Sequence, residues 1–277
     1  MTKPKIKVAT IDLYNNERNE GIRCIKEIVT DVGNNRSAID LQYDVFETRY
    51  KGDFPDFSYD IFISSGGPGS PFEDQDKQWD KDYFNFLDKI WNHNQVSEQK
   101  KYIFFICHSF QMMARYFQFG EVNKRFINSF GVMPFKKSDE GKNDPILKNL
   151  TDPLYAADIR HWQVVNPDNK KLNEFGAKIL AWEIPEEENK DNPAIAAVRI
   201  SNEIAGTQFH PEADPESMLY HFKQDERKKF IIERYNEQKY DEMISYLEHP
   251  EKIKLTRRTV IPAFLNNAID ELISILV

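Results

Sequence analysis

The sequence predicts an α/β fold: a mostly parallel central sheet with helices on both faces. Short, strongly apolar, β-rich runs alternate with stretches in which apolar residues recur at helical spacing, and that alternation is typical of parallel strands joined by helices. With 277 residues, 40% of them hydrophobic, the chain is long enough for one large domain or for a domain with an extension.

The first half of the chain supplies the alternating elements. In the first predicted helix, Ile22, Ile25 and Val29 share one face, and Gly33 ends it. The last strand of this half is the apolar run YIFFI, which leads directly into a helix. We expect strands at 6–13, 41–46, 59–64 and 102–106, and helices at 16–32, at 74–92 and after Ser109.

The second half predicts a small antiparallel β portion followed by helices. Ser201-Asn202 is a candidate hairpin turn, and 183–193 is the most loop-like stretch. Expected strands are 126–135, 154–165, 178–182, 194–199 and 203–209; expected helices are 230–234, 240–247 and 261–276.

The chain therefore divides into a main domain, 1–214, and a C-terminal helical extension, 215–277. The extension's apolar positions favour packing within the chain, while a homodimer contact or a docking surface for another protein stays open. These positions include Ile231, Ile232, Met243, Ile244, Leu247 and Phe264.

Composition excludes several classes of protein. The formal charge of -8 argues against nucleic-acid binding, which needs Lys and Arg to neutralise phosphates. Two cysteines make no disulfide framework, the N-terminus does not resemble a signal peptide, and no apolar stretch is long enough to span a membrane. We expect a cytoplasmic protein with reduced thiols.

Cys107 stands where the strand 102–106 meets the next helix, in FFICHSFQMM. A sharp strand-to-helix turn presents a nucleophile clear of the sheet, and the positive end of the helix favours a thiolate. The amide of His108 would then be an oxyanion donor. The alternative interpretation is a buried core cysteine.

Two further strand ends carry the residue types that thiol acyl transfer requires. SSGGPGS, residues 64–70, has glycines that let main-chain amides point at a ligand, although such turns are common. GTQFHPE ends at His210, with Glu212 two residues on; a histidine can take the thiol proton and a carboxylate can orient it. Because ligands bind beyond the carboxyl ends of parallel strands, the three segments can meet in space.

SSGGPGSP, ICHSFQ and GTQFHPEAD resemble, in order and spacing, the signature segments of class I (triad-type) glutamine amidotransferases, such as the glutaminase portion of GMP synthetase. The resemblance covers about residues 6 to 213 and implies their flavodoxin-like fold. It also implies a role for each of these residues: catalytic, Cys107, His210 and Glu212; oxyanion hole, the amides of Gly67 and His108; substrate binding, Gly66, Gln111, His161 and Trp162.

The sequence departs from the family at the elbow. The family usually has glycine two residues before and two after the cysteine, where this chain has Phe105 and Ser109. Ser109 is small, but Phe105 is bulky and predicts a different backbone or a larger pocket beneath it. His108 either tunes the thiolate or faces the sheet, and we favour the second.

The resemblance implies a small-molecule substrate, either glutamine or another γ-glutamyl compound. The former releases ammonia for a separate synthetase subunit, and the latter is cleaved by a stand-alone hydrolase with the same triad. A catalytically silent binding subunit is the third alternative. Neither a metal nor an organic cofactor is expected, because the spacing of the Cys and His residues is not that of a zinc site.

Overall fold

The computed structural model describes residues 3–184, 192–249 and 251–276. Its strands are β1 (Lys5–Ile11), β2 (Asp40–Phe46), β3 (Ile61–Ser64), β4 (Tyr102–Ile106), β5 (Glu121–Lys137), β6 (Leu154–Val165), β7 (Lys178–Glu183), β8 (Ile195–Arg199) and β9 (Ile204–Thr207). They form one nine-stranded sheet in the order β2-β1-β3-β4-β9-β8-β7-β5-β6. The first five strands in this order are parallel, and the remaining four continue the sheet as antiparallel neighbours.

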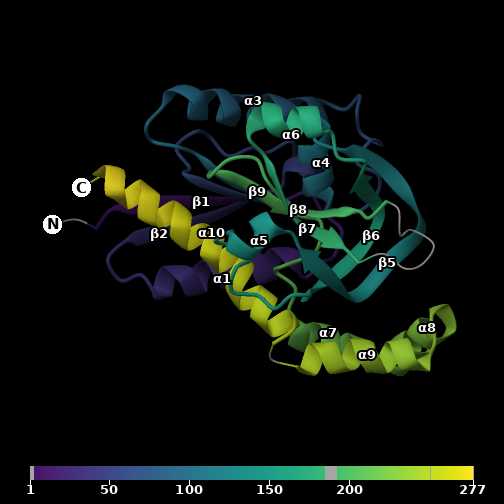
Figure 1. Ribbon diagram of the computed structural model, residues 1–277. Coiled ribbons are helices and arrows are strands. Elements are labelled where there is room, and N and C mark those ends of the chain that lie inside the picture. The colour runs from purple at the N-terminus through teal and green to yellow at the C-terminus, as the bar shows by residue number, and fades with distance from the viewer. Residues whose placement is uncertain (1–2, 185–191, 250, 277) are drawn as a thin grey trace.

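The helices lie on both faces of the sheet (Figure 1). Side chains of α1 and α10 pack on one face, and those of α3, α4 and α6 pack on the other. The α/β class is therefore confirmed. The helices are α1 (Gly21–Asn34), α2 (Thr48–Lys51), α3 (Gln78–Val96), α4 (His108–Phe117), α5 (Asp139–Asn143), α6 (Asn169–Phe175), α7 (Pro215–Phe222), α8 (Asp225–Arg234), α9 (Glu237–Glu248) and α10 (Ile253–Leu276).

Strand β4 shows why the parallel strands are apolar throughout. Its alternate side chains enter two different cores: Phe104 lies on the α1–α10 face, and Phe105 on the α3–α4 face. Phe104 contacts Phe264 of α10, with ring centroids 5.2 Å apart. A strand buried on both faces has no position for a polar side chain, so polar chemistry begins only where β4 ends.

The bulky Phe105 is accommodated by the strand beside it. Phe105 pairs across the sheet with Gly206 of β9 and is fully buried. A Cβ added at Gly206 would lie 2.9 Å from both the Cβ and the carbonyl oxygen of Phe105. Gly206 of β9 thus leaves the space in which the Cβ and carbonyl of Phe105 lie.

The antiparallel strands β5 and β6 form a long hairpin with a register shift between Lys124 and Ser129. Strand β6 is the last strand of the sheet, so one of its edges is not paired with another long strand. Helices α7 to α9 cover this hairpin through a third apolar cluster, which includes Val132 and Ala157 of the hairpin and Phe222, Ile231 and Met243 of the helices. The apolar residues of the C-terminal helical extension thus pack within the chain.

Several boundaries differ from those predicted. The helix predicted from residue 16 begins at Gly21, because Asn15 and Asn16 both adopt positive φ values in a loop that precedes it. Helices α2, α5 and α6 were not predicted, and β5 is longer than the expected 126–135. Most of the predicted loop 183–193 lies outside the described residues. In the part of the chain that the structure describes, no helix has the length and apolarity needed to cross a membrane.

We predict that Gly206→Ala destabilises the protein by about 1–3 kcal/mol, because the new methyl group has no room against the main chain of Phe105. The matched control is Gly33→Ala in α1, where the added Cβ would meet Leu41 at an ordinary 3.4 Å and alanine favours the helix. Urea unfolding measures both. Equal unfolding free energies for Gly206→Ala and wild type would contradict this account of the Phe105 site.

Candidate active site

Cys107 occupies the turn between β4 and α4 with φ 49° and ψ -99°, a conformation that side-chain-bearing residues rarely adopt. The strain is held by neighbouring strands: the Cys107 amide donates to the Thr207 carbonyl at 2.9 Å, and its own carbonyl accepts from Gln111 as α4 begins. The sequence expectation that the chain turns sharply at this cysteine is therefore met in the backbone.

Ser109 ties this turn to the next strand. Its hydroxyl accepts from the amide of Ile106 at 2.8 Å and donates to the carbonyl of Ser64 at 2.7 Å. Both bonds are buried, where an unpaired amide or carbonyl would be costly. A glycine at this position could make neither bond, so Ser109 holds the elbow against the end of β3.

The glycine-rich loop after β3 approaches its neighbours too closely for side chains. A Cβ added at Gly67 would lie 2.5 Å from the carbonyl oxygen of Leu13. Behind the loop, the buried Arg49 donates to the carbonyl of Pro68 at 2.7 Å and forms ion pairs with Glu73 and Asp74. The loop is thus a rigid main-chain wall.

His210 follows β9, the strand beside β4, so the thiol and the imidazole come from neighbouring strand ends. Its Nδ1 lies 2.8 Å from Oε1 of Glu212, a carboxylate that is only 2% exposed. The ring also passes Gly66, where an added Cβ would lie 2.9 Å from His210 Cε1. Gly66 therefore leaves the space in which the imidazole stands.

The open edge of β6 contacts both Cys107 and His210. The amide of His210 donates to the carbonyl of Ala157 at 2.8 Å, as an isolated antiparallel bridge. The thiol of Cys107 lies 3.9 Å from the carbonyl oxygen of Ile159. Carbonyls two residues apart on a strand point the same way. One strand edge therefore positions the thiol and the imidazole together.

The charges at the site favour a protonated imidazole. Burial alone would lower the pKa of His210, but the charges of Glu212 and Cys107, with hydrogen bonds to both, raise this pKa well above its ordinary value. Burial, followed by the negative charges of Glu212 and Cys107, also raises the pKa of Tyr14 well above its usual range. The arrangement is therefore an acid–base pair beside a neutral tyrosine hydroxyl.

His108 does not add positive charge to the site. Burial, helped by the positive charges of Arg49 and Arg115, lowers its pKa to about 3. Its side chain is 2% exposed, and its Nδ1 has no hydrogen-bond partner among the described residues. As the first residue of α4, however, His108 carries a main-chain amide that has no acceptor within the helix.

A cavity of about 470 Å³ collects the predicted residues. All of them line it except Gly66, which lies against His210. His161 is exposed and Trp162 is half-buried. The side-chain amide of Gln111 donates to the main-chain carbonyl of Trp162 at 3.2 Å and to the side chain of Gln208 at 3.4 Å. Gln111 thus ties α4 to β6; its direct contact with substrate stays a prediction.

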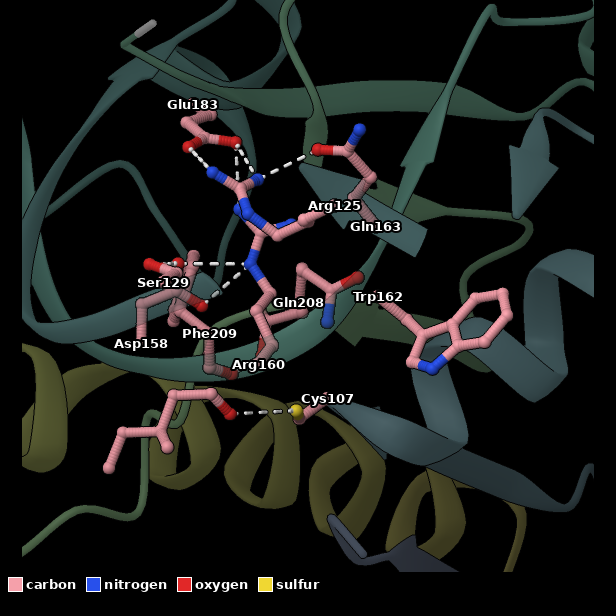
Figure 2. A network of polar contacts seen from close by, with 12 residues as sticks. Cys107, Arg125, Ser129, Asp158, Arg160, Trp162, Gln163, Glu183, Gln208 and Phe209 are labelled. Atoms are coloured by element: carbon pink, nitrogen blue, oxygen red, sulfur yellow. Dashed lines mark hydrogen bonds and ion pairs between the residues drawn. The ribbon is translucent and has the colours of Figure 1, made fainter. Parts of the chain in front are cut away.

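A buried network of charges fixes β6, and Figure 2 shows it above Cys107. Arg160 Nε bonds to both carboxylate oxygens of Asp158 at 2.9 Å, and its Nη2 bonds to Glu183 at 2.8 Å. Arg125 binds Glu183 with two bonds of 2.8 Å, and Ser129 donates to Asp158 at 2.6 Å. The network locks β6 to β5 and β7 beside the register shift, and so fixes the strand edge that contacts Cys107 and His210.

Sequence reasoning missed several parts of this site. Tyr14 and the loop that follows it line the cavity, as do Cys24 of α1 and residues of α7. Tyr14 lies just beyond β1, at the carboxyl edge of a parallel strand, and that position was an available signal. Arg160 pairs with Asp158 two residues away, but its other partner, Glu183, is 23 residues further along the chain and gave no signal. Among the described residues no group of three or more Cys, His, Asp or Glu side chains is arranged to hold a metal ion.

Comparison with known proteins shows which family the chain matches. Residues 23–228 match the family model described as "Glutamine amidotransferase class-I", which is more than half of the chain. No curated protein has a sequence that matches this one.

Solved structures share the fold at low sequence identity. A glutamine amidotransferase from Thermotoga maritima is 17% identical with a TM-score of 0.64, over 96% of this chain and 98% of that one. A Thermoplasma acidophilum protein described as a GMP synthase subunit is 14% identical with a TM-score of 0.53, over 98% and 96%. The glutaminase domain of a Trypanosoma brucei CTPS with bound acivicin is 11% identical with a TM-score of 0.52, over 75% and 86%.

We predict that Glu212→Gln slows alkylation of Cys107 by iodoacetamide at pH 6–7 by about tenfold. Removing the carboxylate charge lowers the pKa of His210, so less imidazolium is present to stabilise the thiolate. Mass spectrometry of the Cys107 peptide measures the rate separately from Cys24. Glu216→Gln, the same charge change at an exposed position nearby, should keep the wild-type rate. A wild-type rate for Glu212→Gln from pH 5 to 8 would refute the coupling.

We predict that Arg160→Met lowers the unfolding free energy at pH 7 by about 3 kcal/mol, because it removes the ion-pair partner of the buried Asp158 and one of the two arginines that pair with Glu183. Burial alone would raise the pKa of Glu183, but Arg160 and Arg125 lower it. This stabilisation is complete above the ordinary carboxylate pKa and is lost as the pH falls through the depressed native one.

The deficit of Arg160→Met relative to wild type should therefore shrink below about pH 4. Urea unfolding at pH 7 and at lower pH values tests this. Arg258→Met, which removes an exposed ion pair of 3.7 Å, serves as the control and should cost less than about 1 kcal/mol. A deficit that is independent of pH would count against the charge network.

Proposed function

The chain belongs to the class-I glutamine amidotransferase family, and we propose that it hydrolyses the side-chain amide of glutamine through a γ-glutamyl thioester on Cys107. One observation carries the proposal. Cys107 stands in a strained strand-to-helix turn beside His210, which is bonded to the buried Glu212, and all three line one cavity. Nucleophile, base and orienting carboxylate are the parts that thiol acyl transfer needs.

In the first step, the Cys107 thiolate attacks the amide carbon of glutamine while His210 holds the proton. The tetrahedral oxyanion accepts hydrogen bonds from the amides of Gly67 and His108. The rigid loop behind Gly67 and the unused amide at the start of α4 support this assignment. His210 then gives its proton to the leaving nitrogen, the C–N bond breaks, and ammonia departs.

In the second step, water attacks the thioester carbonyl. His210 removes a proton from the water, the C–S bond breaks, and glutamate leaves as Cys107 regains its thiolate form. Glu212 keeps the imidazole in one orientation through both steps, and the pKa of His210, raised above its ordinary value by Glu212 and Cys107 despite burial, supports the acid role. The amides of Gly67 and His108 donate to the oxyanion in both steps, formation and hydrolysis of the thioester.

The ammonia acceptor would be a separate protein. One structural neighbour is described as a subunit of GMP synthase, which supports a partnership of this kind. The catalytically silent alternative rests on the bulky Phe105 and on the long helical tail. Against its first argument, Phe105 is accommodated opposite Gly206, which supports an active elbow. Binding of the glutamine amino-acid end by Gly66, Gln111, His161 and Trp162 is part of the proposal.

We predict that the purified protein releases glutamate from glutamine and that Cys107→Ala lowers the rate at least about 1,000-fold, because no other group replaces the nucleophile. Cys24→Ala, which removes the protein's other thiol, is the matched control and should retain the thioester chemistry. Coupled detection of glutamate gives the rates.

If turnover requires the ammonia-accepting protein, a γ-glutamyl chloromethyl ketone still tests the site. It should label Cys107 in wild type and in Cys24→Ala, and the labelled peptide identifies the residue. Absence of both glutamate release and Cys107 labelling would refute the proposed function.

A further inference from the structure

Tyr14 is held at the active site by the chain on either side of it. Its amide donates to the carboxylate of Asp12 at 2.8 Å, and its carbonyl accepts from the amide of Glu17 at 3.0 Å. Between Tyr14 and Glu17, Asn15 and Asn16 adopt φ values of 54° and 60°, in the left-handed region where residues other than glycine are uncommon. Backbone strain of this kind is concentrated at functional sites. The loop after β1 therefore presents Tyr14 in a defined position.

Two glycines leave the space in which the Tyr14 hydroxyl lies. A Cβ added at Gly21, the first residue of α1, would collide with this oxygen, and a Cβ added at Gly66 would lie 3.1 Å from it. The same added Cβ at Gly66 would lie 2.9 Å from Cε1 of His210. The tyrosine oxygen and the imidazole are therefore neighbours beside the glycine-rich loop.

The Tyr14 hydroxyl is available to a bound molecule. Tyr14 lines the cavity that contains Cys107, and its hydroxyl has no hydrogen-bond partner in the part of the chain that the structure describes. Burial, followed by the negative charges of Glu212 and Cys107, raises the pKa of Tyr14 well above its usual range, so the hydroxyl is neutral at pH 7. A neutral hydroxyl can accept hydrogen bonds as well as donate one. Because a hydroxyl withdrawn from solvent is costly without a partner, this one favours a ligand that supplies the bond.

The second step of the proposed mechanism needs one more hydrogen-bond acceptor than His210 provides. The water directs a lone pair at the thioester carbon, and one of its two hydrogens goes to the imidazole. The other hydrogen needs an acceptor beside the imidazole, where the oxygen of Tyr14 lies. Glu212 does not serve, because its Oε1 is bonded to His210 and its Oε2 is buried. A free water must be oriented before it attacks, whereas the leaving nitrogen of the first step is held by the substrate, so this contact matters most for hydrolysis.

Resting on the proposed thioester chemistry, we propose that Tyr14 is a catalytic residue that orients the hydrolytic water. Its oxygen accepts a hydrogen bond from one hydrogen of the water while His210 removes the other hydrogen as a proton. The new C–O bond forms, the C–S bond breaks, and the electron pair leaves with the sulfur of Cys107 as a thiolate. The remaining hydrogen of the water stays on the new carboxyl group and passes to solvent as glutamate ionises. Tyr14 itself gives up no proton.

Tyr14→Phe, which removes only the oxygen, should slow hydrolysis of the thioester about tenfold, the effect of losing one hydrogen bond, and leave its formation close to the wild-type rate. With enzyme in excess over glutamine, acid quenching at successive times and the mass of the Cys107 peptide give separate rate constants for the two steps. γ-Glutamyl methyl thioester forms the same adduct if glutamine reacts slowly, because its thiolate leaves more readily than an amine. Tyr50→Phe, at an exposed tyrosine of α2 outside the cavity, is the matched control and should keep both rate constants.

The outcomes separate this inference from the proposed function. An adduct that decays at the wild-type rate in Tyr14→Phe, or equal slowing of both steps, overturns the role of Tyr14 and leaves the thioester chemistry intact. Urea unfolding of Tyr14→Phe should match wild type, because the hydroxyl bonds no described residue; a large loss of stability would make the oxygen structural and overturn the role as well. Absence of the adduct in wild type, with no labelling of Cys107 by the chloromethyl ketone, overturns the thioester chemistry itself.

Discussion

The site depends on the contact between the edge of β6 and the ends of β4 and β9. The thiol and the imidazole belong to neighbouring parallel strands, but each follows its strand into a different turn. The carbonyl of Ala157 accepts from the main-chain amide of His210, and the carbonyl of Ile159 lies 3.9 Å from the thiol of Cys107, so both contacts come from one strand edge. That edge would otherwise be unpaired main chain, which proteins cover because it invites association. Here the covering groups include the amide of His210 and the thiol of Cys107.

The cost of this arrangement falls on a few buried positions. Cys107 holds a backbone conformation that costs about 1–3 kcal/mol. Glu212 has one carboxylate oxygen bonded to His210 and one buried without a partner among the described residues. The apolar strands, the Ser109 hydroxyl and the Arg160 network offset these costs. Because these supports, Arg160 excepted, lie outside the cavity, the site can stay strained while its surroundings stay rigid.

The strand ends that carry the thiol and the imidazole could be predicted from the sequence, because the relevant signals are local. YIFFI ends at Cys107, and IAGTQF ends at His210, so each apolar run marks its own strand end. The resemblance to the family then supplied roles for the residues at those ends. The α/β class and the family are confirmed, whereas the roles, the division at residue 214 and the oligomeric state remain predictions.

What could not be predicted depends on contacts between distant parts of the chain. Apolar spacing continued the first helix back to residue 16, but the two positive φ values at Asn15 and Asn16 create a loop that the cavity uses. Phe105 predicted a different backbone or a larger pocket at the elbow, and its partner Gly206 could not be identified because it follows about a hundred residues later. The position of α7 over the cavity depends on Arg23, in a helix near the other end of the sequence.

The central claim is that Cys107 carries the acyl group. The most direct measurement is the mass of the Cys107 peptide after the protein is mixed with glutamine and quenched rapidly in acid. The account predicts a γ-glutamyl adduct on that peptide, whereas glutamate release with the acyl group on another residue, or on none, would contradict it.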